Sequence, residues 1–312
     1  MKLHAFILMF TAGAMALGAE MQNGRIRFEE SSELKQTGKT VFLPVFIEQK
    51  SGDHLVIEGE EFSEFAPMRN EDRLAFQPDY SNGCAVVNAG RLAYVFSIAQ
   101  PGEYQVWIRA FFPLKANYNH TEKMDDGAAR NISDSMDPAK GSKTARKISS
   151  NACFLEPGFW HWTPNFTYRL DRGKHHWDWG KQAWCGGCLL DKIVLIRKGS
   201  PVKPEDAGTE NRVRHSPENG TLLSRRIRTE RIAAWLFEYA ADPGGGSVSV
   251  EYSYDEKRFY PLKNRQRYPI TPGRGEYLWI RIRMKNDPAG KRPPIIYHYA
   301  FRFEKRVWPG RY

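Results

Sequence analysis

Hydrophobic and polar residues alternate along much of this chain, and a period of two is typical of β-strands with one buried face. Residues 91–111 show this alternation on both sides of Pro101 and Gly102, which predicts two antiparallel strands joined by a turn. Residues 277–284 repeat it with apolar residues and arginines in alternate positions. Short strands recur at regular spacing, and no segment has a convincing helical period. The pattern predicts an all-β fold of two β-sandwiches in series.

Composition divides the chain into five segments. Residues 1–19 carry an early lysine, a short uncharged apolar run and small residues, the layout of a secretory signal peptide. We interpret residues 20–53 as a polar lead-in with a first strand, residues 54–199 as one sandwich, and residues 221–312 as another. Residues 200–220 are rich in proline and charge, which is typical of a linker. No run reaches the about 20 apolar residues of a membrane span, so we expect a secreted, periplasmic or cell-surface protein.

Positive charge is concentrated in the C-terminal part of the chain. The whole chain has 46 Lys and Arg against 36 Asp and Glu, a net charge of +10. Residues 212–312 contain 21 of the basic and 10 of the acidic residues, which is +11 and leaves −1 for residues 1–211. An arginine face of this kind fits an acidic polysaccharide or an anionic envelope, and a solvated face that only keeps the protein soluble is the alternative. We do not expect nucleic acid as a partner.

Aromatic residues are concentrated between residues 157 and 195, which hold five of the nine tryptophans, three of the eight histidines and two of the four cysteines. Such a density fits a packed core, a metal or catalytic centre, or a surface that grips something flat. Trp177 and Trp179 follow a turn and alternate on a strand pattern, so we expect them to pack in the core.

Four motifs in order resemble carbohydrate-binding modules of the family 6 and family 35 kind, over about residues 54–199. They are "IEGEEF" at 57–62, "PGEYQVWIRA" at 101–110, "GFWHWTPNFTYRLDRGKHH" at 158–176 and "LLDKIVL" at 189–195. The resemblance implies a jelly-roll β-sandwich that binds sugar chains without cutting them. It also implies a structural calcium ion held by Glu58, Glu60 and Asp191, and carboxylate oxygens are the ligands that calcium prefers. The alternative is that these acids are solvated or paired with lysine or arginine.

The resemblance assigns the ligand-contacting residues only in part. The resemblance makes Trp160 the residue that stacks on the apolar face of a sugar, because a flat aromatic ring suits that face. The asparagine that this family has two residues before the last-strand aspartate is Leu189 here, so the usual cleft is altered. Trp184, or Tyr80 together with Asn82 from an early loop, are the substitutes that we predict.

The cysteines favour disulfides over redox or metal chemistry. Cys84, Cys153, Cys185 and Cys188 allow two bridges with three pairings in an oxidising compartment. We expect Cys84 or Cys153 to bond to the 185–188 loop. A redox "CGGC" motif would need a helix after it, and the sequence that follows is strand-like. Zinc bound by the 185–188 pair and a histidine is a further alternative.

No catalytic motif is present, although acids in the long polar segment 113–152 could flank a glycosidic bond; they are Asp125, Asp126, Asp134 and Asp137. The sequence therefore predicts an exported, non-catalytic protein that holds a polysaccharide, acidic ones included, by aromatic stacking. Its partners would be that polysaccharide and a glycan-degrading enzyme. The alternatives are a polysaccharide-degrading hydrolase or lyase with an unrecognised site, and a surface structural or adhesion protein.

Overall fold

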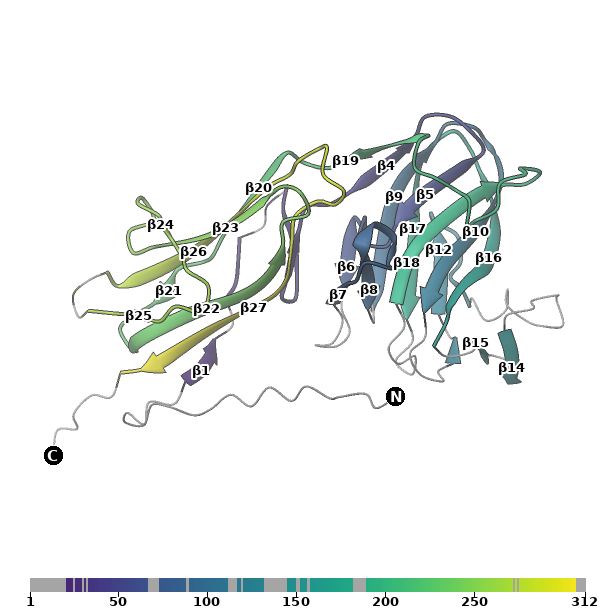
Figure 1. Cartoon of the computed structure of the whole chain (residues 1–312). Helices are drawn as coiled ribbons and strands as arrows, with labels where there is room; N and C mark the ends of the chain where they lie inside the picture. The colour runs from purple at the N-terminus through teal and green to yellow at the C-terminus, as the bar shows by residue number, and fades with distance from the viewer. Residues whose placement is uncertain are drawn as a thin grey trace.

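The computed structural model describes residues 21–306, with gaps at Arg25, Glu30, Ser32, Asn119, Pro272 and Arg274 and at residues 67–72, 88–89, 112–116, 132–144, 150–151, 156–157 and 182–188. The described residues form β-strands and one short 3-10 helix, η1 (Ser81–Gly83), without any α-helix (Figure 1). Within this part of the chain, no helix is long and apolar enough to cross a membrane. The predicted all-β fold of β-sandwiches is confirmed.

The first sandwich consists of two facing sheets. One sheet has the order β16 (Trp160–Leu170), β10 (Gly102–Phe111), β18 (Leu189–Arg197), β8 (Cys84–Val87), β7 (Arg73–Phe76), with β5 (His54–Glu58) also paired to β18. The other has the order β13 (Arg130–Asn131), β12 (His120–Met124), β17 (Gly173–Lys181), β9 (Arg91–Ile98), β4 (Phe46–Gln49), β19 (Arg212–His215), with β6 (Glu64–Ala66) on β9. A small sheet of β11 (Asn117–Tyr118), β15 (Ala152–Leu155) and β14 (Ala145–Ser149) adjoins them.

The core of the first sandwich is built from the alternating positions that the sequence predicts. Tyr94 and Phe96 of β9 and Val106 of β10 are buried and belong to one hydrophobic cluster that spans both sheets. Trp177 and Trp179 of β17, each 1% exposed, lie in the same region of the interior. The prediction that these two tryptophans pack in the core is confirmed.

The second sandwich is likewise made of two sheets around a core of Trp235, Phe237, Ile280 and Ile282. One sheet has the order β2 (Lys35–Thr37), β3 (Thr40–Phe42), β27 (Ile295–Lys305), β22 (Ile232–Asp242), β25 (Tyr268–Pro269), with β1 (Met21–Gly24) on β27. The other has the order β20 (Asn219–Leu223), β26 (Tyr277–Lys285), β23 (Ser247–Ser253), β24 (Tyr260–Pro261), with β21 (Ile227–Arg228) on β26.

The N-terminal segment differs from the expected lead-in at residues 20–53, because its strands β1 to β3 belong to the second sandwich. Val41 of β3 lies opposite Ile296 of β27. Leu34, Val41 and Leu43 are at most 1% exposed and lie in the second core. The physical reason is that short strands cannot bury their apolar side chains alone, and β27 offers the free edge on which they pair.

The segment expected to be a linker, residues 200–220, packs on the first sandwich and contains strand β19 and the start of β20. Val202 and Ala207 pack on the outer face of the β10–β18 sheet. β19 then pairs with β4 in the first sandwich, and β20 begins the second. The connection is therefore held to both units by packing and by strand pairing.

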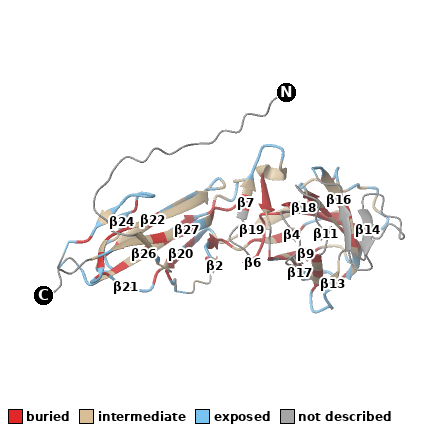
Figure 2. Cartoon of the chain, turned by 90° about the horizontal axis from the view of Figure 1, so that it is seen from below, coloured by how far each residue is buried: buried red, intermediate tan, exposed pale blue. Residues whose placement is uncertain are grey.

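The two sandwiches lie end to end and contact one another (Figure 1 and Figure 2). Phe42 of the second meets Phe62 of the first in an edge-to-face contact, with ring centroids 4.9 Å apart. Arg292 forms a 2.8 Å ion pair with Asp242 and donates a hydrogen bond to the carbonyl oxygen of Asn82. The junction thus combines aromatic packing with a charged hydrogen-bond network.

Candidate functional site

β16 is the edge strand of its sheet and pairs with β10 (Figure 1). A row of aromatic side chains lies on the outer face of these two strands. In the antiparallel register Arg109 is opposite Trp162, and Phe111 is opposite Trp160. The alternate residues of β10 are buried in the core, so Trp107, Arg109 and Phe111 face outward. We call Trp107, Phe111, Trp160 and Trp162 the aromatic strip.

The strip is half-buried and supported from one side. Trp107 and Trp162 pack against a small apolar cluster of β5, β18 and the 200–211 segment, formed by Val56, Val194, Ile196 and Ala207. Phe159, next to the strip, is 58% exposed and is one of the most exposed large apolar side chains described. A supported row of partly exposed rings can bind a flat apolar surface without losing much side-chain entropy on binding.

Trp160 is the centre of a contact cluster at one end of the strip. The Arg109 guanidinium lies over its ring, 4.5 Å from the centroid. The Tyr80 ring meets it edge-to-face at 5.5 Å, and the Phe111 ring lies at 5.4 Å. The structure therefore brings together Trp160 and Tyr80, two of the predicted ligand contacts that are 80 residues apart.

Arg109 is held in place by Asp191, whose side chain is fully buried. The pairing of β10 with β18 shifts between Arg109 and Ala110, and Asp191 is the residue left without a partner in this register. Such β-bulges redirect a side chain. The Asp191 carboxylate accepts a 2.6 Å hydrogen bond from Arg109 Nη1 and a 2.7 Å bond from the Ser81 amide. It thereby fixes one side of the guanidinium.

Burial raises the pKa of Asp191, and the guanidinium of Arg109 and the amide of Ser81 oppose this shift. The close ion pair with Arg109 favours the ionised form of Asp191, whereas the raised pKa indicates that the neutral form is favoured. The loss of hydration of a fully buried carboxylate outweighs its attraction to one partly exposed guanidinium, which is common for buried pairs. The pair therefore serves to position Arg109 more than to stabilise the fold.

Two of the three predicted calcium ligands fit a cation. Glu58 and Glu60 are 4% and 5% exposed, and one oxygen of each has no hydrogen-bond partner among the described residues. Burial raises the pKa of both carboxyl groups. Asp191, in contrast, is taken by Arg109, the arginine pairing that the sequence left as an alternative. In the described part of the chain no group of three His, Cys, Asp or Glu side chains could hold a metal ion.

Asn82 is turned toward the second sandwich and not toward Trp160. Its Nδ2 donates to Oε1 of Glu60 at 2.9 Å and to the Lys291 carbonyl at 2.8 Å. Its backbone is left-handed, with φ of 55°, a conformation in which asparagine is enriched. The prediction that Tyr80 and Asn82 share a rim with Trp160 therefore holds for Tyr80 only, and Trp184 lies outside the described residues.

Of the four cysteines, Cys84 is the one whose side chain the structure describes. Cys84 is a free, fully buried thiol in this structure, and burial raises its pKa. The Cys84 disulfide is therefore not formed. Cys185, Cys188 and the side chain of Cys153 lie outside the described residues, so their pairing with each other or with zinc stays a prediction.

The acids proposed for a catalytic alternative do not form a facing pair among the described residues. Asp125 and Asp126 lie in an exposed turn after β12. Asp125 accepts a 2.7 Å hydrogen bond from the His176 amide and contacts Nδ1 of His175 at 2.8 Å. These bonds tie the turn to β17. Asp134 and Asp137 lie outside the described residues.

Glu122 is a buried acid that sequence analysis did not identify. It is 1% exposed, and its oxygens accept hydrogen bonds from Tyr168 Oη (2.8 Å), Asn165 Nδ2 (2.8 Å) and the Phe166 amide (3.1 Å). Burial raises its pKa. Because these bonds join β12 of one sheet to β16 of the other, Glu122 closes this side of the sandwich. The signal available in the sequence was its place between the inward positions of His120 and Met124.

Trp107, Arg109 and Phe111 were also missed as candidate contacts. The alternation in residues 102–111 already places them opposite the core-facing residues. Large aromatic residues at four outward positions of two neighbouring strands are unusual, since outward positions of a sheet are normally polar. That pattern was the signal that could have revealed the strip.

Comparisons with known proteins give distant matches. No protein-family model matches the chain, and a search of curated proteins finds no match. Among solved structures, it is similar to a GH26-CBM35 β-(1,4)-mannanase from Podospora anserina at 14% identity, covering 49% of this chain and 29% of that one with a TM-score of 0.34. It is similar to the tandem CBM22 domains of Paenibacillus barcinonensis Xyn10C at 12% identity, covering 81% and 98% with a TM-score of 0.30.

A third similarity is to the ANX1 ectodomain from Arabidopsis thaliana at 6% identity, covering 82% of this chain and 97% of that one with a TM-score of 0.25. The match to the mannanase spans less than a third of that protein's length. At these identities and TM-scores, the similarities assign no function to the chain.

Proposed function

We propose that this protein is an exported, non-catalytic carbohydrate-binding protein that holds a polysaccharide on the aromatic strip. The observation that carries the proposal is the row of half-buried rings on the outer face of β10 and β16, supported by the cluster behind it. A pyranose ring has one face of C–H groups and a rim of hydroxyls, and binding sites pair apolar walls with a few placed polar groups. The strip and Arg109 supply both.

Each residue would have a distinct part. Trp162 and the part of Trp160 that Arg109 leaves uncovered would stack on successive sugar rings, and Tyr80 would hold Trp160 from its edge. Arg109 has five N–H donors, and Asp191, itself held by the Ser81 amide, fixes its position without using all of them. The remaining donors would bond ring hydroxyls, or a uronic carboxylate if the polysaccharide is acidic. The enzyme and the adhesion protein remain the competing functions.

A glycan array with the mature protein tests the proposal, followed by titration of the best ligand. Trp160→Ala and Trp162→Ala should each weaken binding about tenfold or more, as for an interfacial aromatic hot spot of about 2 kcal/mol. Tyr260→Ala is the matched control, because Tyr260 is 43% exposed in the second sandwich and lies away from the strip; it should bind like the wild type. Unchanged melting temperatures would show that the variants are folded.

Three results would count against this function. Full glycan binding by both strip variants would show that the binding site lies elsewhere. Absence of glycan binding on a broad array would favour the adhesion protein. Release of reducing sugar from a polysaccharide by the wild type, lost in a strip variant, would favour the enzyme.

A further inference from the structure

The second sandwich contains a pocket that the carbohydrate proposal does not use. It has a volume of about 750 Å³ and is lined by residues of β1, β21, β22 and β27 together with their flanking turns. This volume lies in the range of roughly 300–1,000 Å³ that is typical of sites for small ligands. The pocket is in the domain that carries the excess positive charge, far along the chain from the aromatic strip.

The floor of the pocket is apolar. It is formed by five side chains from both sheets: Ile26, Ile227, Ile232, Phe301 and Phe303. Gly24 lies directly against the two phenylalanine rings, and a Cβ at that position would come within 3.0 Å of Phe301 and 3.1 Å of Phe303. The missing side chain lets β1 pass close to the rings while the space beside them stays open.

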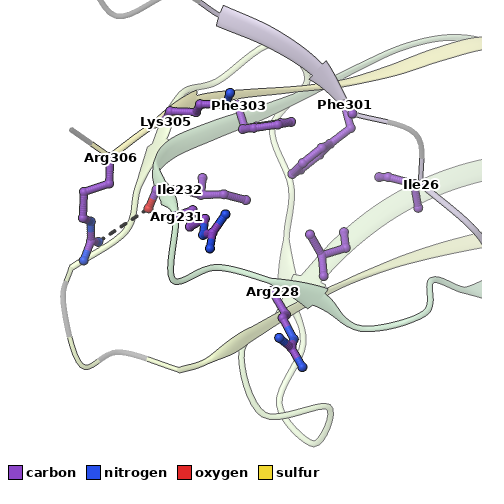
Figure 3. Close-up of a pocket in the computed structure, with 10 residues that line it drawn as sticks. Ile26, Arg228, Arg231, Ile232, Phe301, Phe303, Lys305 and Arg306 are labelled. Atoms are coloured by element: carbon purple, nitrogen blue, oxygen red, sulfur yellow. Dashed lines mark hydrogen bonds between the residues drawn. The ribbon is translucent and has the colours of Figure 1, made fainter. Parts of the chain in front are cut away.

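The rim of the pocket is cationic, as Figure 3 shows, with Arg228, Arg231, Lys305 and Arg306 around the apolar floor. In the described part of the chain, none of these four side chains forms an ion pair with an acid. Other arginines of the same domain are paired, for example Arg267 with Glu304 and Arg302 with Glu238. Four cations without an acidic partner around an apolar cavity would complement a ligand that combines a negative charge with an apolar part.

We infer that this pocket binds a single-chain anionic amphiphile of the long-chain fatty acid class. The hydrocarbon chain would lie on the isoleucine and phenylalanine floor, and the carboxylate would lie among the rim cations. Arg306 is prearranged for this, because its guanidinium is held at 3.1 Å by the carbonyl oxygen of Ile270. A neutral sugar would leave the floor unfilled, and a small inorganic anion would use the rim alone. The inference stands apart from the proposed function, since it depends on the second sandwich only.

The test uses the mature full-length protein and a fluorescent fatty acid whose emission rises in an apolar site. We expect saturable binding, displacement by palmitate, and weaker displacement as the chain is shortened, by up to about fourfold per methylene. Hexadecanol has the same chain without the charge, so it should displace the probe at least about tenfold less well than palmitate. Acetate should not displace it.

Variants separate the floor from the rim. Arg228→Gln with Arg231→Gln should weaken palmitate about tenfold and leave hexadecanol unchanged. The matched control is Lys257→Gln with Arg258→Gln, two exposed cations of the same domain outside the pocket. Ile227→Trp should fill the cavity and abolish probe binding, and an unchanged melting temperature would show that this variant is folded. Ile227→Val, which keeps the cavity open, is the second variant should the tryptophan not fold; it should retain binding.

Several outcomes would overturn the inference. No saturable probe binding would do so, as would equal displacement by palmitate and hexadecanol. Binding that appears only after removal of residues 307–312 would show that the pocket belongs to the chain's own C-terminal segment. A dimer in sedimentation that the Ile227→Trp substitution dissociates would show that a second copy is the occupant.

Discussion

The replacement of Glu60 by glutamine should stabilise this protein, although Glu60 is a buried and hydrogen-bonded residue. Three acids at the end of β5 and in the turn after it come close together: Glu58, Glu60 and Glu61. Glu61 is neutralised by a two-pronged ion pair with Arg212. Glu60 is 5% exposed, and only its Oε1 has a partner, the Nδ2 of Asn82 at 2.9 Å. Its Oε2 has none among the described residues.

The direction of the effect follows from the pKa of Glu60. Burial, and then the neighbouring charges of Glu58 and Glu61, raise this pKa well above its ordinary value of 4.5. The folded state therefore binds a proton at Glu60 more tightly than the unfolded state does. The resulting stabilisation is fully present below the ordinary pKa and is lost as the pH rises through the raised value. Above the raised pKa, the ionised Glu60 destabilises the fold.

The magnitude comes from the unsatisfied oxygen. A buried group without a partner costs roughly 1–3 kcal/mol, and more when it is charged. Glutamine keeps the acceptor for Asn82 and removes the negative charge that Glu58 and Glu61 disfavour. Glu60→Gln should therefore raise the free energy of unfolding by about 1–3 kcal/mol near pH 8. At about 2–4 °C per kcal/mol for units of this size, the melting temperature should rise by several degrees.

The assay is thermal unfolding between about pH 5 and pH 8 in buffer with a calcium chelator. The wild type should lose stability as the pH rises, and Glu60→Gln should lose less. Glu122→Gln is the control, because Glu122 is also buried with a raised pKa, but both its oxygens accept hydrogen bonds. The amide N–H of a glutamine at this position would face groups that also donate hydrogen bonds, so this variant should be destabilised. A lower melting temperature for Glu60→Gln at pH 8 would refute the reasoning.

Three further predictions concern calcium and the junction of the sandwiches. Calcium at 100 times its dissociation constant should stabilise the wild type by about 2.7 kcal/mol and Glu60→Gln much less, and an equal effect on both would exclude this site. A fragment of residues 221–312 should be unfolded by circular dichroism, since it lacks the strands of residues 21–43, and a cooperative melt would contradict this. Arg292→Ala should remove the hydrogen bond to the Asn82 carbonyl of the first sandwich and speed proteolysis between the sandwiches, with the core stability unchanged as judged by the melting temperature; equal cleavage rates would show that this bond is unimportant.

Periodicity predicted the elements of this fold but not all their partners. The alternation around Tyr94 and Phe96 placed those residues in the core correctly, although their strand β9 pairs with β17, β4 and β6 and not with the neighbouring strand β10, which lies in the facing sheet. "TVF" at 40–42 also has the character of a strand. Its partner β27 begins at Ile295, more than 250 residues later. A period of two specifies which face of a strand is buried, but it does not specify the sheet edge with which a short strand pairs.

The candidate site was likewise predictable from the sequence only in part. Trp160 and Tyr80 could be proposed from the family resemblance and the chemistry of sugar faces, and they are in contact. Asp191 was assigned to calcium by resemblance, but it faces Arg109 because a bulge of one residue in β18 redirects it. Bulges depend on how two strands fit together, so a single sequence does not reveal them. Arg109 itself could have been found, since its outward position follows from the alternation of its strand.

The acids near the expected calcium site and the junction between the sandwiches form one connected network. The side-chain Nδ2 of Asn82 donates hydrogen bonds to Oε1 of Glu60 and to the carbonyl oxygen of Lys291. The backbone carbonyl oxygen of Asn82 accepts a hydrogen bond from Arg292, which forms an ion pair with Asp242. A change of charge at Glu60, by a proton or by a cation, therefore acts on the side chain that joins the two units. Because charges in a low-dielectric junction interact strongly, the ionisation of Glu60 should be coupled to the contact between the sandwich with the aromatic strip and the sandwich with the cationic pocket.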